Sequence, residues 1–494
     1  MGRWNAKEQL TLGVELVRSW NIEMVVALNF VVYQIRSSYL PTIVRDRLID
    51  LNREEFSNMS SAEQNAFIGK TFATIQQVSG AIKTPVSFIV GPLYGSFSDE
   101  WGRKPLLLWA EMGGVLLYFS YQYFGSFSLR GGVWSIQYLV GALRALVSGE
   151  PPIFAAYVSD DLFDRPHLLF ARFVSLGAIR ATAALAASLF GVILWSALFA
   201  DHFEAATYAL LLCTSLSAFC FFYVLFFIRP ILPRNTDRTH SATASRKSKG
   251  ALAVASGTLQ RLFGTIGKAF VVLVKPRVRW RRTILLLAIL QTIINVSSGY
   301  QEEYLLRTYT LLPPFSWEPP DIASYQLANS VSQIVAQTAG SYFLRRILRF
   351  EYSTIVMVAS FGSVGSALTV ALASSRWHIY IKVLFDGMSA PADGVSAKLV
   401  SELVDPNEVG KVFALVGFGV VANALLQELV LNEAYKVGLD TGRPQLPWYL
   451  LAGICAVVLA AWIPGHFLYA REKAHIRTQL RARAASRRDT RAKE

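Results

Sequence analysis

The stretch GPLYGSFSDEWGRKPLLL, residues 91–108, changes abruptly from apolar to charged and back again. Asp99, Glu100, Arg103 and Lys104 interrupt a sequence that is otherwise dominated by apolar residues. Charged side chains are costly inside a lipid bilayer, so a break of this kind predicts a short connection between two membrane-crossing helices. The stretch therefore predicts that the chain crosses a membrane both before and after it.

The whole chain has the composition of an integral membrane protein. Of its 494 residues, 53% are hydrophobic and only 17% are charged, and its mean hydropathy is +0.36. A helix that crosses a bilayer needs roughly 20 mostly apolar residues, and twelve runs of this kind predict an all-α membrane protein. We place them at 21–44, 72–96, 105–128, 133–158, 172–199, 206–228, 283–305, 321–344, 353–373, 378–400, 412–432 and 447–470. No cleavable signal peptide is evident, so we expect the first run to be retained.

The positive charge is concentrated in two segments. The net charge is +14, and residues 229–282 and 471–494 carry 22 of the 48 Lys and Arg residues. Basic segments that flank membrane spans stay in the cytoplasm, where they also meet anionic lipid headgroups. We therefore expect cytosolic termini and a lipid partner, and no nucleic-acid partner.

The basic segment at 229–282 also divides the chain. We expect a cytosolic segment at 1–20, six helices in 21–228, a linker at 229–282, six helices in 283–470 and a basic tail at 471–494. Apolar residues at helical spacing between 257 and 275 predict an amphipathic surface helix in the linker. Two six-helix halves indicate a pseudo-symmetric transporter with its binding site between the halves.

The opening stretch contains the pattern G-x-x-x-D-x-x-G-R-K-P. Its residues are Gly95, Asp99, Gly102, Arg103, Lys104 and Pro105. The pattern resembles the signature loop of the major facilitator superfamily. The resemblance implies a cytosolic gate in which Asp99 pairs with Arg103 and caps a neighbouring helix. The alternative is a basic turn that only sets the topology.

Further stretches resemble the proton-coupled folate transporter family, solute carrier family 46. They are NIEMVVALNFVVYQIRSSYLPTIVRDRL from 21, AAYVSDD from 155, LRTYTLLPPFSW from 306 and SAKLVSELVDPNEVGKVFA from 396. Departures accompany the matches: Gly177 stands where the family has a coupling glutamate, and Arg180 follows one turn later. The seventh span also lacks the family's histidine, and the family's cysteine pair is absent. These departures argue against folate as the substrate.

Ionisable residues inside expected spans are candidates for substrate binding or coupling. They are Arg36, Glu150, Asp160, Arg180, Asp386 and Asp393. Arg180 favours an anionic substrate, and Asp160 ranks first for proton coupling because it lies in the stretch most similar to the family. A structural role is the alternative for each; Asp386, for example, is spaced to pair with Lys382 on the same helix. We expect Glu302 and Glu303 to form a polar rim.

These observations predict a secondary transporter that moves a small organic solute, favoured to be an anion, by alternating access. Proton coupling and uncoupled diffusion both stay open. The alternatives are an exporter of drug-like or amphipathic compounds, and a sensor or scaffold that keeps the fold without transport. No zincin helix, nucleophile elbow or P-loop indicates an enzyme, and we expect no metal or cofactor.

The expected location is the plasma membrane or an endolysosomal membrane. The sequon that begins at Asn58 lies in the loop between the first two spans, on the side opposite the cytosol in this topology. Asn58 is therefore a candidate glycosylation site.

Overall fold

The computed structural model describes residues 22–101, 103–126, 157, 169–190, 198, 202–230, 273–277, 280–340, 342–404 and 409–493. Throughout these ranges the regular structure is helical. The N-terminal half contains α2 (Ile22–Leu51), α3 (Arg53–Asn58), α4 (Ser61–Trp101), α5 (Arg103–Ser126), α8 (Leu169–Leu189) and α10 (His202–Phe227). The C-terminal half contains α13 (Arg281–Thr310), α14 (Pro319–Val335), η3 (Ala336–Gly340), η4 (Phe343–Ile347), α15 (Tyr352–Ala371), α16 (Arg376–Ser389), α17 (Ala392–Leu403), α18 (Val409–Asp440) and α19 (Leu446–Lys493).

The described helices overlap the expected spans except the fourth, 133–158, of which only Tyr157 is described. The span expected at 378–400 is divided into α16 and α17 at Ala390 and Pro391. A proline has no N–H to continue a helix, so a break beside Pro391 has a simple physical cause. The surface helix expected within 257–275 falls almost entirely outside the described residues.

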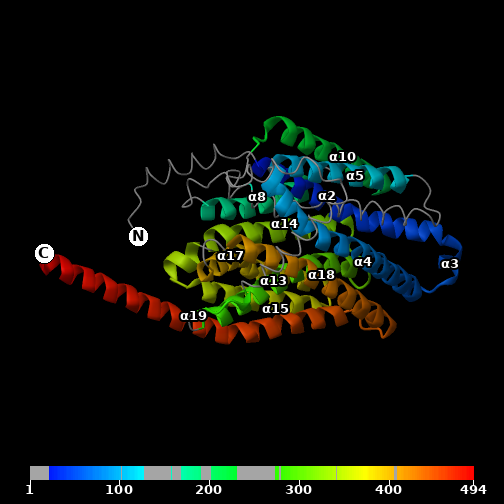
Figure 1. Ribbon diagram of the computed structural model, residues 1–494. Helices are drawn as coiled ribbons and strands as arrows, with labels where there is room; N and C mark the ends of the chain where they lie inside the picture. The colour runs from blue at the N-terminus through cyan, green and yellow to red at the C-terminus, as the bar shows by residue number, and fades with distance from the viewer. Residues whose placement is uncertain are drawn as a thin grey trace.

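Five of the described helices are long and apolar enough to cross a membrane by themselves. The segments are Thr207–Phe227, Arg281–Thr310, Tyr352–Ala371, Leu415–Asp440 and Leu446–Ala474. The basic tail continues α19 as a helix to Lys493 and projects away from the bundle (Figure 1). The helix therefore extends well beyond the last expected span.

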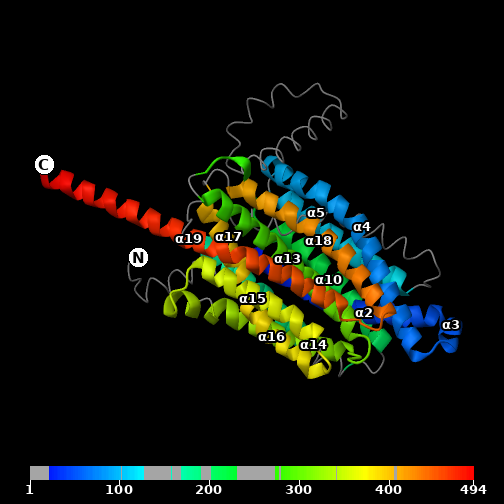
Figure 2. The same cartoon turned by 90° about the horizontal axis from the view of Figure 1, so that it is seen from below.

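The helices lie side by side and form a bundle with two distinct ends (Figures 1 and 2). At one end lie the short helix α3 and the connections from α13 to α14, α15 to α16 and α18 to α19. We call this the α3 end. The tail of α19 leaves the bundle at the opposite end, which we call the tail end.

One hydrophobic cluster at the α3 end contains residues from both halves. Phe56 and Phe72 of the N-terminal half belong to the same buried cluster as Tyr309, Trp317 and Trp448 of the C-terminal half. Each of these side chains is at most 6% exposed. Burial of such large apolar groups is worth about 1.5–3 kcal/mol each relative to water. At this end, therefore, the apolar core itself joins the halves.

Toward the tail end the buried clusters belong to one half each. Leu107 and Val224 lie in a cluster made only of N-terminal residues. Val356 and Trp462 lie in a cluster made only of C-terminal residues. Contact between the halves there is made by α8, which packs against α14, η3 and α17.

Candidate functional site

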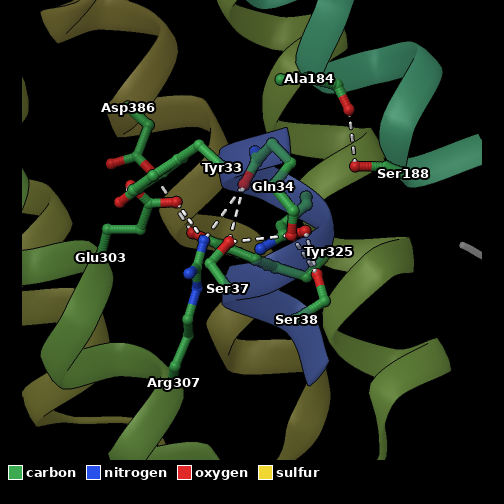
Figure 3. Close-up of polar contacts among 11 residues, drawn as sticks. Tyr33, Gln34, Ser37, Ser38, Ala184, Ser188, Glu303, Arg307, Tyr325 and Asp386 are labelled. Atoms are coloured by element: carbon green, nitrogen blue, oxygen red, sulfur yellow. Dashed lines mark hydrogen bonds and ion pairs between the residues drawn. The ribbon is translucent and has the colours of Figure 1, made fainter. Parts of the chain in front are cut away.

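A polar network joins the halves at the α3 end, beside the shared apolar cluster. Arg307 of α13 donates through Nη2 to Oε1 of Gln34 on α2, at 3.2 Å. Arg307 also pairs with Glu303 one turn earlier, and the hydroxyl of Tyr33 donates to Oε2 of Glu303 at 3.2 Å. Figure 3 shows these side chains converging from the two helices. We call Tyr33, Gln34, Glu303 and Arg307 the gate network.

A second contact between α2 and the C-terminal half extends this network. The hydroxyl of Ser38 donates to Oε1 of Gln326 on α14, at 3.0 Å. Both side chains are buried, so water does not readily replace this hydrogen bond. α2 is therefore held to both α13 and α14 by polar side chains one turn apart.

The helices α4 and α18 form the other side of this closed end. Nε2 of Gln77 donates to the Leu429 carbonyl and to Oε2 of Glu433, at 3.2 Å each. Lys70 pairs with Asp440 closer to the α3 end. Gly69 packs against the Leu312 and Leu439 side chains, so a large side chain at this position would crowd the contact between α4 and α18.

A buried ionic cluster lies inside the C-terminal half. Nζ of Lys382 lies 2.6 Å from Oδ2 of Asp386 and 3.1 Å from Oε1 of Glu302. Ser366 contacts both carboxylates, and its distance to Oδ1 of Asp386 is 2.6 Å. The hydroxyl of Tyr325 donates to Oδ2 of Asp386 at 3.3 Å. The Glu302 side chain is 13% exposed, which makes the expected rim position wrong for this residue.

The N-terminal half holds a buried ion pair of its own. Nε of Arg172 on α8 lies 2.7 Å from Oε1 of Glu23 on α2, and Nη2 lies 3.4 Å from Oε2. Their side chains are 0% and 2% exposed. Nearby on α5, the 1%-exposed Glu111 accepts a 2.7 Å hydrogen bond from Nδ2 of Asn29. These contacts tie α2 to α5 and α8 within one half.

Arg180 lies on α8, the helix that faces the C-terminal half. Its guanidinium carbon lies 5.3 Å from the centre of the Phe30 ring. Its Nε is buried and makes no hydrogen bond to any described residue. Across the interface, a side chain at Gly177 would meet the Gln337 amide of η3. The Gln337 side chain therefore occupies the space next to Gly177.

Several amide atoms of the C-terminal half are also buried without a described hydrogen-bond partner. They include Asn295 Nδ2 on α13, Gln326 Nε2 and Asn329 Oδ1 on α14, and Gln337 Oε1 on η3. A buried polar atom is usually hydrogen-bonded to protein, water or ligand. These atoms and Arg180 Nε are thus available to a polar solute or to water.

The structure places only part of the signature motif. Gly95 and Asp99 lie on the last turns of α4, but the side chain of Asp99 and the whole of Gly102 fall outside the described residues. Arg103 is buried at the start of α5, and Nζ of Lys104 donates to the Leu225 carbonyl of α10 at 2.8 Å. Lys104 therefore neutralises the end of a helix in its own half, and the pairing of Asp99 with Arg103 stays a prediction.

The other candidates are distributed across the bundle. Arg36 is half-buried on α2. Asp386 makes the expected pair with Lys382. Asn58 ends α3 and is exposed, and its Nδ2 donates to the Glu54 carbonyl at 3.2 Å. The side chains of the remaining three candidates are not described. Glu150 and Asp160 lie outside the described residues, and Asp393 is described only as part of α17.

The sequence reasoning did not select several charged residues as site candidates, although the structure assigns them to buried contacts. Arg172 and Glu111 were not named at all, Glu302 was expected at a polar rim, and Lys382 was named only as the partner of Asp386; all four lie within expected spans. The rule that picked out Arg180, namely an ionisable residue in a span, would have selected them too. Their partners could not have been found, because each partner except Asp386 lies on a different helix.

Comparisons with known proteins agree with this architecture. A model of the Major Facilitator Superfamily matches residues 86–426. The Drosophila melanogaster protein "Probable peptidoglycan muropeptide transporter SLC46" is 24% identical over 381 residues, which cover 74% of this chain and 68% of that protein.

Two solved transporters have a similar fold. The nucleoside transporter NupG is 14% identical with a TM-score of 0.52, and 90% of this chain and 99% of that one are covered. The human organic anion transporter MFSD10 is 17% identical with a TM-score of 0.54. The match covers 89% of this chain and 97% of that one. At these identities the likeness concerns the fold alone.

Proposed function

Because this chain belongs to the major facilitator superfamily, we propose that it moves a small polar organic anion across a membrane by alternating access. The observation that carries this proposal is the difference between the ends of the bundle. The halves share a core and a polar network at the α3 end, whereas toward the tail end each has a buried cluster of its own. A joint of this kind at one end can open while each half stays intact.

Arg180 and the unpartnered amide atoms of the C-terminal half support a polar, anionic substrate. Arg180 offers a guanidinium, which can bind a carboxylate through two parallel hydrogen bonds. The unpartnered amide atoms Asn295 Nδ2, Asn329 Oδ1 and Gln337 Oε1 can pair with the amide groups of a peptide or an N-acetylated sugar. A muropeptide contains all of these groups. The name of the Drosophila melanogaster relative makes muropeptides the first class to test.

The transport cycle needs the gate network to break and re-form. When the α3 end opens, Arg307 and Glu303 separate from Gln34 and Tyr33, while the ion pair of Arg172 and Glu23 keeps α2 attached to α8 within its own half. We place the α3 end outside the cell or in an organelle lumen, with both termini and the tail of α19 in the cytosol. A proton gradient drives the movement of the solute.

The test is uptake of radiolabelled muramyl dipeptide, which carries one free carboxylate, into liposomes containing the purified protein. We expect saturable uptake with an outward or inward pH gradient, according to the orientation of the inserted protein. Arg180→Ala should raise the half-saturation concentration strongly. Arg180→Lys should raise it less, because the charge remains but the two-pronged geometry is lost.

Arg345→Ala is the matched control for Arg180. Arg345 is also an arginine that stacks on an aromatic ring, at 3.9 Å from the centre of Tyr352, but it is exposed near the tail end. The Arg345→Ala variant should leave the half-saturation concentration unchanged. An equal effect of both alanine variants would remove Arg180 from the binding site, and absence of any saturable uptake would argue against muropeptides as the substrate.

A further inference from the structure

We propose that Glu302 is the group that carries the proton of the transport cycle, within the buried cluster it forms with Lys382, Asp386, Ser366 and Tyr325. The inference rests on the proposed function, because it requires that a proton moves together with the solute. It assigns the coupling role to a residue on α13, and the sequence had not marked this residue as a candidate.

The first argument is the charge of the cluster. Glu302 and Asp386 bring two carboxyl groups to one ammonium, that of Lys382, within 3.1 Å and 2.6 Å. With every group ionised the cluster would hold one uncompensated negative charge in a buried site. Such a charge is strongly disfavoured, and one bound proton removes it.

The second argument is the number of protons available for hydrogen bonds. The Ser366 hydroxyl lies within hydrogen-bond distance of carboxylate oxygens of both Glu302 and Asp386. A hydroxyl has one proton to donate, so it can satisfy only one ionised carboxylate at a time. Both contacts are favourable together when one carboxyl is protonated and donates to the Ser366 oxygen.

The third argument decides between the two carboxyl groups. Asp386 accepts hydrogen bonds from Lys382 and Ser366 at 2.6 Å each, and from Tyr325 at 3.3 Å. Hydrogen bonds to an ionised carboxylate favour that form. Glu302 has the longer contact with Lys382 and, at 13%, the more exposed side chain. The proton therefore binds a Glu302 oxygen, Glu302 donates to Ser366, and Ser366 donates to Asp386.

The titratable groups that the structure places against Glu302 come from three other helices. Tyr325 of α14 and Lys382 and Asp386 of α16 face the cluster, and Cys455 of α19 lies close enough to Glu302 to interact electrostatically. On α18 the carboxyl of Glu428 packs against Gly80 of α4 instead, where it interacts with Lys83. The proton comes from water and returns to water, so the step needs no other reactant.

The position of Glu302 connects proton binding to the gate. Glu302 and Glu303 are consecutive on α13, yet Glu302 contacts α15 and α16 while Glu303 contacts α2 and Arg307. A movement of α13 that exposes Glu302 to water must also move Glu303 in the gate network. Loss of the proton and opening of the α3 end are thereby coupled through one helix.

A spectroscopic experiment tests the proton site without any substrate. Infrared spectra of the purified protein should show the carbonyl band of a protonated carboxylic acid at neutral pH, and this band should disappear at alkaline pH. Glu302→Gln should remove the band, whereas Glu303→Gln, the same change at the next position, should retain it. In Ser366→Ala the band should disappear at lower pH, because the protonated form loses its acceptor.

A transport experiment tests the coupling. In liposomes with a pH gradient, Glu302→Gln should no longer accumulate radiolabelled muramyl dipeptide above its equilibrium concentration. It should still exchange labelled for unlabelled solute, at a rate that no longer depends on pH. Uphill accumulation by Glu302→Gln, or a carboxylic acid band unchanged in it, would overturn the proposal. Wild-type protein that shows the band but transports no muramyl dipeptide would instead contradict the proposed substrate.

If Glu302→Gln does not fold, as judged by size-exclusion chromatography, the infrared titration of Ser366→Ala tests the proton site instead. This variant removes one hydroxyl from the cluster and no charge. An infrared band that disappears at the wild-type pH in Ser366→Ala would contradict the hydrogen-bond chain on which the proposal depends.

Discussion

The two ends of the bundle are built differently. At the α3 end, aromatic and aliphatic side chains of both halves form one core, and the gate network adds hydrogen bonds between α2 and α13. Toward the tail end, each half has a buried cluster of its own, and the ion pair of Arg172 and Glu23 joins two helices of the same half.

The difference separates two kinds of interaction. In the proposed cycle, contacts within one half survive every step, and the buried ion pair of Arg172 and Glu23 suits that role. Contacts between the halves at the α3 end break and re-form, and they include the shared apolar core as well as hydrogen bonds of modest net strength. Loss of a contact within a half should therefore lower stability, whereas loss of a contact between the halves should change how often the α3 end opens.

The largest effect is expected from the ion pair within the N-terminal half. Arg172→Met leaves the 2%-exposed Glu23 carboxylate without its partner, and loss of one partner of a buried pair costs about 3–5 kcal/mol. The melting temperature of the purified protein should fall markedly. The double variant Arg172→Met with Glu23→Gln should recover part of the loss, because no buried charge remains.

The matched control for this pair is Arg53→Ala. Arg53 pairs with Asp50 at 3.9 Å, but the two side chains are 84% and 58% exposed. Exposed pairs of this kind contribute about 0–1 kcal/mol. A similar fall in melting temperature for Arg172→Met and Arg53→Ala would show that burial does not separate the two pairs.

Next in size is the effect of breaking the gate network. Arg307→Ala removes the donor to Gln34 and the partner of Glu303, and a hydrogen bond to a charged group is worth about 1.5–3 kcal/mol. The melting temperature should change little, while the α3 end should open more often. Reaction of a cysteine introduced at Ser38 with a water-soluble thiol reagent should become faster. An unchanged reaction rate would remove Arg307 from the gate.

Gly69→Leu should open the same end by crowding instead of by lost hydrogen bonds. A Cβ atom at this position would lie 2.7 Å from the Leu439 side chain and 3.1 Å from that of Leu312. Overpacking of this kind costs about 1–3 kcal/mol, and separation of α4 from α18 relieves it. The same cysteine assay measures the effect. Gly453→Leu on α19, where no atom lies within 4 Å of the added Cβ, is the control.

The smallest effect is expected at the first turn of α4, outside the expected span. The backbone N–H and hydroxyl of Ser60 donate to Oε2 of Glu63 at 2.8 Å each and lower the pKa of the Glu63 carboxyl. The stability that the ionised Glu63 carboxylate contributes is therefore fully present above the ordinary pKa of a glutamate. It is lost as the pH falls through the lowered pKa of Glu63. Glu63→Gln should melt slightly earlier at neutral pH, and the difference should vanish in acid. A difference that persists in acid would exclude the carboxylate charge as its cause.

The sequence was sufficient for the helical class, for helices that overlap most of the expected spans and for the superfamily. Hydropathy located α10, α13 and α15 closely, because a helix facing lipid needs a continuous apolar run. It was less accurate where a polar residue or a proline interrupted the run, as at Pro391. The pairing of Lys382 with Asp386 was also predictable, since residues four apart on a helix are neighbours.

The sequence by itself determined that this protein crosses a membrane and has two basic segments, because those properties depend on composition and on order along the chain. Only the tertiary structure decided which charges meet. Glu302 finds Lys382 and Ser366 on two other helices, and Arg307 finds Gln34 some 270 residues away in the chain. Such partners follow from helix packing, whose rotations and offsets no local pattern encodes. The direction in which each of two adjacent glutamates points, and so their different roles, is set by that packing.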